Sequence, residues 1–535
     1  MNALMAALAE RRFFWSLEFI PSVDRILRDD LSRLGGIAAV MKQHGRLATF
    51  AVTDRVVSER DPEPVAAAAN LFDVTGKQPL VHFSGKGREM EDLERMVEHM
   101  QANGLANVLI LTGDRLKSEP PVGRARYLES VPAIQRVRQL QPDWLIACAL
   151  NPFKYCEEDA MAQYLKLGKK VGAGANLVVT QIGFDPQKYI EAATWVAQRG
   201  YRVPLVANVL LLPAARARYI RKHALPGITI TDSFMAMLEA EAKTCPDHGS
   251  ARVLRRLALQ IVGVKLAGYA GVQITGLHAP EKVEALEEAV CQATVECPDR
   301  AAWDVAWREA MTAPDGTVAD PVPHGPSWHL GDRNDARASA KERIKYEVLS
   351  RVHAVVFEHG PIASLFGALM RPFYGKEKTA AGRALEIVER AVKRPVVGCD
   401  TCGMCRLAAT QYVCPETCPK GLANGACGGT TQNRCEFGDR ECIHSVKYRT
   451  AMSAGVQDEL ERLLVPAVPL ARRRTTSWPA HFSGHGPQVV VVHSRHSRSS
   501  LTAVKNRCDA ETKNSMHLKV SESGSGNEST RVSAR

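Results

Sequence analysis

The first 290 residues alternate eight short β-rich runs with amphipathic helical stretches, and this alternation restricts the possible folds more than any other feature. Strands alternating with helices predict a parallel sheet covered by helices. Eight such strands over this length favour a (β/α)8 barrel, the TIM-barrel class. The expected strands are Trp15–Ile20, Thr49–Thr53, Leu80–Ser84, Val108–Thr112, Leu145–Leu150, Leu177–Ile182, Leu205–Leu211 and Val272–Thr275.

A doubly wound parallel sheet is the alternative fold. None of the expected strands is followed by the Gly-x-Gly-x-x-Gly turn with which such sheets bind dinucleotides. The nearest match, Gly172–Asn176, follows a helix and leads into a strand, so we interpret it as a helix C-cap. The barrel is therefore the predicted fold.

A chain of 535 residues is too long for a single hydrophobic core, so several domains are expected. We assign a barrel to residues 1–297, a connector of loop and helices to 298–395, a cysteine-rich metal domain to 396–455 and a basic, disordered tail to 456–535. In the connector, helices are expected at about 337–358 and 379–393. The first has apolar residues at the spacing of a buried core stripe, namely Ile344, Val348, Leu349, Val352 and Val356.

The net charge of +11 does not indicate a nucleic-acid partner, because it is unevenly distributed. Residues 471–535 contain 11 Lys and Arg against 4 Asp and Glu, which leaves only +4 for the other 470 residues. The apolar runs are shorter than the ~20 residues that span a bilayer, and the N-terminus lacks the features of a signal peptide. A cytoplasmic protein without membrane contact is expected.

Eight of the fourteen cysteines lie within 44 residues. Thiols separated by two residues can reach one metal ion or cluster, and in the cytoplasm clustered cysteines bind metal more often than they form disulfides. His444 is a possible additional ligand, although a surface histidine is the simpler interpretation. The predicted metal ligands are Cys399, Cys402, Cys405, Cys414, Cys418, Cys427, Cys435 and Cys442.

Polar residues follow or end most of the expected strands, where TIM barrels carry their active sites. Glu18 lies between apolar neighbours, so its pKa should be raised far enough for it to act as a general acid. Each such residue also has a structural interpretation: a strand-end Asp or Thr often caps the next helix, and a lone Glu often pairs with a cation. The others are Thr53, Asp54, His82, Gly113, Asp114, Asn151, Thr180 and Gln181.

Three of these segments resemble motifs of the methylenetetrahydrofolate reductases. Leu17–Pro21 resembles the strand-one motif of that family, Leu111–Asp114 its Leu-Arg-Gly-Asp segment, and Lys170–Gln181 its longest and most specific motif. The similarity spans roughly residues 11–290, and the motifs occur in the family's order.

The resemblance implies an FAD-dependent barrel in which NAD(P)H reduces the flavin and methylenetetrahydrofolate then takes the hydride. Glu18 would protonate the pterin nitrogen as the bridge opens to an iminium, Asp114 would stabilise that cation, and Gln181 would bind the pterin edge. Thr112 stands where many relatives have Arg, and Asn151 replaces an aromatic residue that often covers the flavin. The implied flavin-binding residues are Thr53, His82, Thr112, Gly113, Asp114, Asn151 and Lys170.

The cysteine-rich segment resembles the C-terminal domain of some bacterial methylenetetrahydrofolate reductases and of the companion subunit of the acetogen enzyme. Eight thiolates suit two [4Fe-4S] clusters or two zinc sites, and the Cys-Pro pairs favour iron–sulfur. Clusters would imply a ferredoxin-like electron partner, while a purely structural metal is the alternative. We also expect a tetrahydrofolate substrate and a homo-oligomer. A folate-dependent methyl-transfer or C1-catabolic component of the same fold, and a catalytically inactive scaffold, remain alternative functions.

Overall fold

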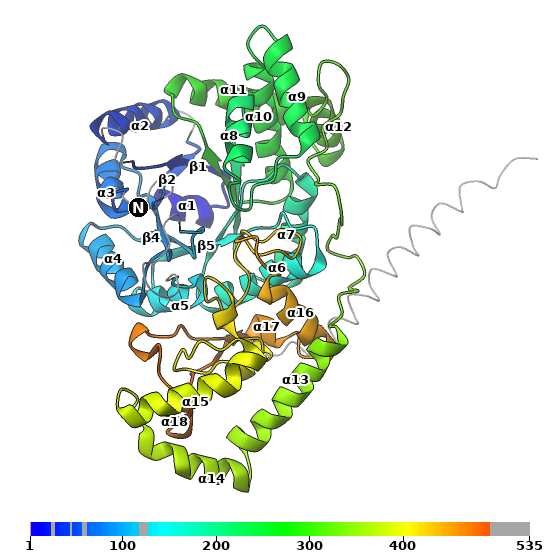
Figure 1. The fold of residues 1–535 in the computed structure, drawn as a ribbon. Coiled ribbons are helices and arrows are strands. Elements are labelled where there is room, and N and C mark those ends of the chain that lie inside the picture. Colours follow the sequence, from blue (N-terminus) through cyan, green and yellow to red (C-terminus); the bar gives the residue numbers. More distant parts are fainter. Residues whose placement is uncertain (1, 23–26, 43–44, 56–60, 117–126, 493–535) are drawn as a thin grey trace, which may run out of the picture. The chain divides into compact units, whose positions relative to one another are not determined.

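The computed structural model describes residues 2–22, 27–42, 45–55, 61–116 and 127–492. Eight parallel strands form a closed barrel in the order of the sequence, with β1 hydrogen-bonded to both β2 and β8 (Figure 1). The predicted TIM-barrel fold is confirmed, and each predicted strand matches an observed one to within two residues. The strands are β1 Phe14–Phe19, β2 Leu47–Val52, β3 Leu80–Ser84, β4 Asn107–Leu111, β5 Leu145–Leu150, β6 Leu177–Thr180, β7 Leu205–Leu210 and β8 Gly271–Thr275.

Helices between the strands cover the outside of the barrel (Figure 1). Their amphipathic pattern explains the packing: α4 buries Leu93, Met96, Val97 and Met100 along one face. Three helices follow β7, whereas a simple βα repeat has one. The barrel helices are α2 Leu27–Lys42, α3 Pro64–Thr75, α4 Met90–Ala102, α5 Ser130–Leu140, α6 Glu157–Gly172, α7 Pro186–Gln198, α8 Ala214–Lys222, α9 Asp232–Thr244, α10 Ser250–Leu266, α11 Pro280–Glu296 and α12 Arg300–Ala310.

The amino end of the barrel is closed by the short helix α1, Ala3–Ala9. Its Leu4 and Ala7 are fully buried and join the inward-facing apolar side chains of the strands, such as Leu80 and Leu145, in one cluster. This cluster fills the half of the barrel interior that lies at the amino ends of the strands. Polar chemistry is consequently confined to the carboxyl ends of the strands.

The connector forms a helical arm, by which we mean residues 340–397. It consists of α13 Ala340–His353, a π-helical turn Ala354–Glu358, α14 Pro361–Met370, a 3₁₀ turn Arg371–Phe373 and α15 Ala380–Val397. The predicted core stripe is wrong: none of its five residues is fully buried, and Ile344, Val348 and Val352 are 63%, 51% and 48% exposed. They lie on the side of α13 that faces away from the rest of the chain. No single described helix is long and apolar enough to cross a membrane, although residues 340–358 and 361–373 qualify together as a bent pair.

The cysteine-rich segment has little regular structure before α16, Ile443–Ala454; only the 3₁₀ turns Ala408–Thr410 and Pro415–Thr417 precede it. His444 on α16 is buried, so the surface interpretation of this residue is wrong. The predicted tail also begins too early. Leu464 and Trp478 are buried, and residues up to 492 form α17 Glu459–Arg462, β9 Leu463–Leu464, the 3₁₀ turn Leu470–Arg472, α18 Trp478–Phe482 and β10 Val490–Val491. Residues 493–535 lie outside the described part of the chain.

Barrel, arm and cysteine-rich segment belong to one compact unit, residues 1–492. The buried carboxylate of Glu129 accepts hydrogen bonds from the backbone amides of Ala423 and Asn424 at 3.0 Å each. Arg449 forms ion pairs with Glu158 of the barrel and Glu342 of the arm, at 3.3 and 2.9 Å. Since such buried polar contacts are costly to leave unpaired, the segment is an integral part of the structure.

Candidate active site

A cavity of about 260 Å³ lies at the carboxyl ends of the strands. All nine predicted catalytic, substrate and flavin residues line it: Glu18, Thr53, His82, Thr112, Gly113, Asp114, Asn151, Lys170 and Gln181. The expectation that these residues share one mouth is confirmed. The volume is slightly below the ~300–1,000 Å³ typical of ligand pockets, so the cavity suits part of a dinucleotide rather than all of it.

Glu18 projects from β1 beside Thr275 of β8 and near Arg216 of α8. Burial raises the pKa of its carboxyl to about 7, although a hydrogen bond from Thr275 and the charge of Arg216 oppose this shift. At neutral pH the group is therefore close to half-protonated. A substantial fraction of the molecules therefore carries the proton that Glu18 can donate to a ligand, whereas an ordinary carboxyl group is almost fully ionised at this pH.

Within the described part of the chain, three polar atoms of the cavity wall have no hydrogen-bond partner: the hydroxyl of Thr53, Nε2 of His82 and Oε1 of Gln273. Thr53 and His82 are only 3% and 5% exposed. Burial lowers the pKa of His82 to about 4, so its imidazole is neutral at physiological pH. Because buried polar atoms are normally paired, this wall is built for a polar ligand.

Asp54 has a structural role instead. Its carboxylate accepts two hydrogen bonds from Arg88, at 2.7 and 3.2 Å, and one from the amide of Ser84 at 2.7 Å. These contacts connect the ends of β2 and β3. Asp54 therefore has a structural role, but it pairs with a buried cation and does not cap the following helix, whose N-cap is Glu63.

Gly113 at the end of β4 has a φ of 86°, and a Cβ there would lie 2.2 Å from the hydroxyl of Ser84. Only glycine fits this turn without displacing β3. The turn brings Asp114 to the exposed rim of the cavity. Desolvation by the surrounding protein raises the pKa of its carboxyl, while the nearby ammonium of Lys420 opposes the shift.

Lys170 lies in the last turn of α6 and reaches β5, whereas Gln181 directly follows β6. The ammonium of Lys170 donates to the carbonyl of Ala149 at 2.6 Å, and burial lowers the pKa of this lysine to about 8. Gln181 accepts a hydrogen bond from the amide of Ile182 at 2.8 Å. Its amide nitrogen donates to the carbonyl of Pro226 at 3.4 Å, a long contact that a better-placed ligand acceptor can replace.

The cysteine-rich segment supplies part of the cavity wall, which the sequence did not predict. Asn151 donates to the carbonyl of Gly428 at 2.8 Å, so its amide holds this segment. Lys420 donates to the carbonyl of Gly113 at 2.8 Å and pairs with Glu436 at 2.5 Å. No local signal links these residues to strands that precede them by nearly 300 positions. The segment's lining residues are Lys420, Ala426, Cys427, Gly428, Gly429 and Glu436.

The eight clustered cysteines separate into two sets. Cys399, Cys402, Cys405 and Cys414 line one small cavity of about 20 Å³. Cys418, Cys427, Cys435 and Cys442 influence one another electrostatically. Within the described residues, however, no three His, Cys, Asp or Glu side chains are placed as the ligands of a formed metal site.

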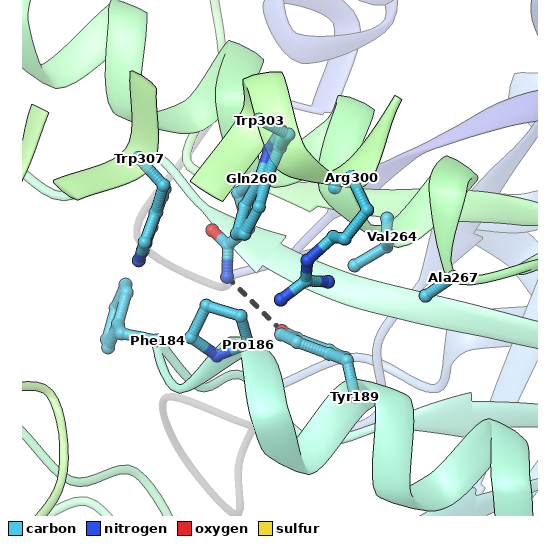
Figure 2. A pocket seen from close by; sticks show the side chains of 10 residues that line it. Phe184, Pro186, Tyr189, Gln260, Val264, Ala267, Arg300, Trp303 and Trp307 are labelled. Atoms are coloured by element: carbon cyan, nitrogen blue, oxygen red, sulfur yellow. Dashed lines mark hydrogen bonds between the residues drawn. The ribbon is translucent and has the colours of Figure 1, made fainter. Parts of the chain in front are cut away.

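A separate cavity between α7, α10 and α12 has a volume of only about 10 Å³, which is room for one water molecule. Figure 2 shows Trp303 and Trp307 on one side of it, and Gln260 donating to the hydroxyl of Tyr189 at 3.3 Å. Its walls are mainly aromatic and aliphatic. We regard it as a packing space without a chemical role.

A closed parallel barrel with acid, amide and ammonium groups converging at one mouth defines the class: a TIM barrel organised like an enzyme. Comparison with known proteins identifies two family domains in the chain. Residues 3–268 match the family model of methylenetetrahydrofolate reductase, and residues 379–468 match a model described as methylene-tetrahydrofolate reductase C terminal. The chain therefore contains a methylenetetrahydrofolate reductase family domain followed by a C-terminal domain related to that family.

Several curated relatives carry that name. The chain is 25% identical to the 5,10-methylenetetrahydrofolate reductase of Escherichia coli over 155 residues, which are 29% of this chain and 50% of the relative. It is 25% identical over 215 residues to the probable methylenetetrahydrofolate reductase (NADPH) of Caenorhabditis elegans, covering 38% and 31%. It is 26% identical over 163 residues to methylenetetrahydrofolate reductase (NADH) 1 of Arabidopsis thaliana, covering 27% and 26%. The chain thus spans about a quarter to a half of these relatives.

Among solved structures, the chain is similar to an uncharacterized protein from Clostridium thermocellum described as binding two copies of 5-methyl-5,6,7,8-tetrahydrofolic acid. The identity is 12% and the TM-score 0.42, over 55% of this chain and 99% of that one. A similarity this low supports no argument about the ligand of the present chain.

Proposed function

We propose that the chain is a flavin-dependent methylenetetrahydrofolate reductase, which interconverts 5,10-methylenetetrahydrofolate and 5-methyltetrahydrofolate. The observation that carries the proposal is Glu18, a carboxyl with a pKa of about 7 that shares a cavity with Asp114 and Gln181. Opening the one-carbon bridge of the folate requires a proton at a pterin nitrogen. A half-protonated carboxyl is suited to deliver it at neutral pH.

The residues of the cavity fit a flavin. The unpartnered atoms of Thr53 and His82 offer hydrogen bonds to a heteroaromatic ring, and Lys170 provides a cation on the opposite side. Bound FAD would supply the hydride for the one-carbon unit, after its own reduction by NAD(P)H. The volume of the cavity admits the ring system and leaves the remainder of the dinucleotide at the mouth.

The side chains then act on the folate in defined ways. Glu18 gives its proton to the pterin nitrogen, which leaves a carboxylate beside Thr275 and Arg216 to stabilise the ionised form. Asp114 offers negative charge to the iminium cation that results. Gln181 exchanges its long bond to Pro226 for the pterin edge.

The test is the variant Glu18→Gln, with Glu98→Gln on the exposed side of α4 as the matched control. We expect folate turnover to fall by about 10²–10⁴-fold, the usual value of general acid catalysis, while NAD(P)H still reduces the bound flavin. Rapid-mixing absorbance of the two half-reactions separates these effects. Folate turnover that survives in Glu18→Gln contradicts the role of Glu18, and a colourless preparation contradicts the flavin.

A second function, electron exchange with a ferredoxin-like partner, is supported by Cys427, which belongs to one cysteine set and also lines the cavity. We propose that each set of four thiols holds one metal centre, an iron–sulfur cluster or zinc. Four thiolates match the ligand number of both. Anaerobic purification followed by metal analysis and visible spectroscopy distinguishes the two metals.

The variant Cys427→Ser, with the exposed Cys291→Ser as control, tests the electron route. Loss of flavin reduction by reduced ferredoxin, with reduction by NAD(P)H retained, supports it. Equal reduction by ferredoxin in both variants contradicts it. A methyl-transfer role without flavin is excluded by a yellow preparation that contains FAD.

A further inference from the structure

The turn that carries Asp114 is held from both sides by the cysteine-rich segment. Lys420 donates to the carbonyl of Gly113 at 2.8 Å. The amide of Arg115 donates to the carboxylate of Glu436 at 2.7 Å. Asp114 lies between these two contacts in the sequence. Because the turn has neither helical nor strand conformation, its position depends on contacts of this kind.

Lys420 and Glu436 also form a buried ion pair with each other. Their charged atoms are 2.5 Å apart, and their side chains are only 2% and 5% exposed. The ammonium of Lys420 lies 5.3 Å from the ring centre of Tyr127, whose hydroxyl donates to the carbonyl of Asp114 at 3.1 Å. A Cβ on Gly429 would lie 2.5 Å from the carboxylate of Glu436, so this glycine leaves room for the pair. The pair is thus packed in one arrangement against the turn.

Anchoring of the segment does not by itself account for this pair, because the segment is attached to the barrel at other places. The amide of Asn424 donates to Glu129 at 3.0 Å. Gln163 donates to the carbonyl of Cys427 at 2.8 Å. A buried ion pair adds little net stability compared with apolar side chains of the same size, since both charges lose their hydration. Its place at the cavity wall is better explained by its effect on the adjacent turn.

The charges around Asp114 suit a cationic ligand. Desolvation raises the pKa of its carboxyl, while the ammonium groups of Lys420 and, more weakly, Lys86 favour the ionised form. Glu436 compensates the charge of Lys420, so this pair as a whole adds no net charge. The carboxylate of Asp114 therefore keeps its attraction for a positive group in the cavity.

We propose that Lys420 and Glu436 are positioning residues for the reductase reaction, and that the cysteine-rich segment thereby forms part of the folate site. They hold the carboxylate of Asp114 where the positive charge of the one-carbon iminium develops. This inference rests on the proposed function, which gives Asp114 that task. A displacement of about 1 Å at a reacting centre costs about 10²-fold in rate, so a loosened turn should slow the folate step strongly.

The test replaces the ion pair by apolar side chains of similar size in the variant Lys420→Met/Glu436→Leu, an exchange that buried sites usually tolerate. Rapid mixing measures how fast methylenetetrahydrofolate reoxidises the reduced flavin at saturating folate. We expect this rate to fall roughly 10–100-fold, while NAD(P)H reduces the flavin at the wild-type rate. The melting temperature and the bound FAD per chain should match those of the wild type.

Glu436→Gln keeps the shape of the side chain without its charge and is the second variant. It should show a smaller loss of the same kind. Should the pair variant lose its FAD, a wild-type folate rate in Glu436→Gln overturns the proposal.

Lys154→Met is the matched control. Lys154 is a buried cation that donates to the carbonyl of Gly428 at 2.9 Å, so its loss weakens the attachment of the same segment at a contact outside the turn. The control should reoxidise its flavin at the wild-type rate. A folate step that slows equally in Lys154→Met shows that a loosened segment is the cause and overturns the proposal, as does a wild-type folate rate in the pair variant.

Asp114→Asn shows whether the pair acts through Asp114. In that case, adding the pair exchange to Asp114→Asn produces no further loss of folate rate, whereas independent effects multiply and overturn the proposal. The same variants separate this proposal from the proposed function. A wild-type folate rate in Asp114→Asn refutes the role of Asp114 itself, whereas a slow Asp114→Asn with a fast pair variant refutes only the positioning role.

Discussion

Replacing Glu18 by Gln should stabilise the chain, and the gain should depend on pH. The pKa of this carboxyl is about 7 in the folded protein and 4.5 without the cavity around it. The folded state therefore holds an extra proton between these two values. The contribution of Glu18 to the free energy of unfolding is fully present below pH 4.5. It is lost as the pH rises toward 7, because the buried carboxyl must then ionise in the folded state.

The difference of about 2.5 in pKa corresponds to about 3 kcal/mol at 1.36 kcal/mol per unit. Water in the cavity screens part of this energy, so we expect about 2–3 kcal/mol. Gln has nearly the same shape and cannot ionise. Compared with the wild type, Glu18→Gln should have equal stability near pH 4.5 and greater stability at pH 7 and above.

The assay is thermal unfolding, followed by circular dichroism from pH 4.5 to pH 8, of the wild type, Glu18→Gln and the control Glu98→Gln. The melting temperature of Glu18→Gln should exceed that of the wild type by a few degrees at pH 8, and the difference should vanish at the acidic end. A difference that stays constant over this range would refute the raised pKa. The control should follow the wild type throughout.

The remaining predictions concern stability and assembly. Asp54→Asn should destabilise the barrel by about 3–5 kcal/mol, because it leaves Arg88 without its charged partner in the interior; chemical denaturation measures the loss, and a loss below 1 kcal/mol contradicts the buried pair. Lys420→Met should remove the cation that pairs with Glu436 and donates to the carbonyl of Gly113, and so loosen the cysteine-rich segment from the cavity, which limited proteolysis should detect as faster cleavage after residue 398. Trp303→Ala should cost about 3–5 kcal/mol, since this buried indole packs on α10 and donates to the carbonyl of Leu259; an unchanged melting temperature would show that the site collapses without cost.

Much of the barrel was predictable from the sequence because its signals are local. Runs such as Leu145–Leu150 are continuous and apolar, as expected for strands covered on both faces, and the polar residues that follow such strands must meet at one edge of a parallel barrel. Glu18, His82 and Gln181 could be placed together on that basis. Their common cavity follows from chain order and strand direction.

Other features depend on contacts between distant segments. The periodicity of Ile344, Val348 and Val352 predicts an apolar face, but it does not say whether that face meets the chain's own core, solvent or another molecule. The division of the eight cysteines into two sets follows from the path of an irregular segment whose spacing permits several groupings.

By itself, the sequence determined the order of strands and helices, the barrel and the acid at its mouth, because the periodicity of side chains along a strand or helix reflects local burial. Only the tertiary structure decided that Lys420 and Gly428 complete the cavity and that apolar side chains of the arm remain exposed. Contacts of this kind arise from the docking of two surfaces with complementary shape and charge. Neither surface contains a local sequence pattern from which its partner surface could be predicted.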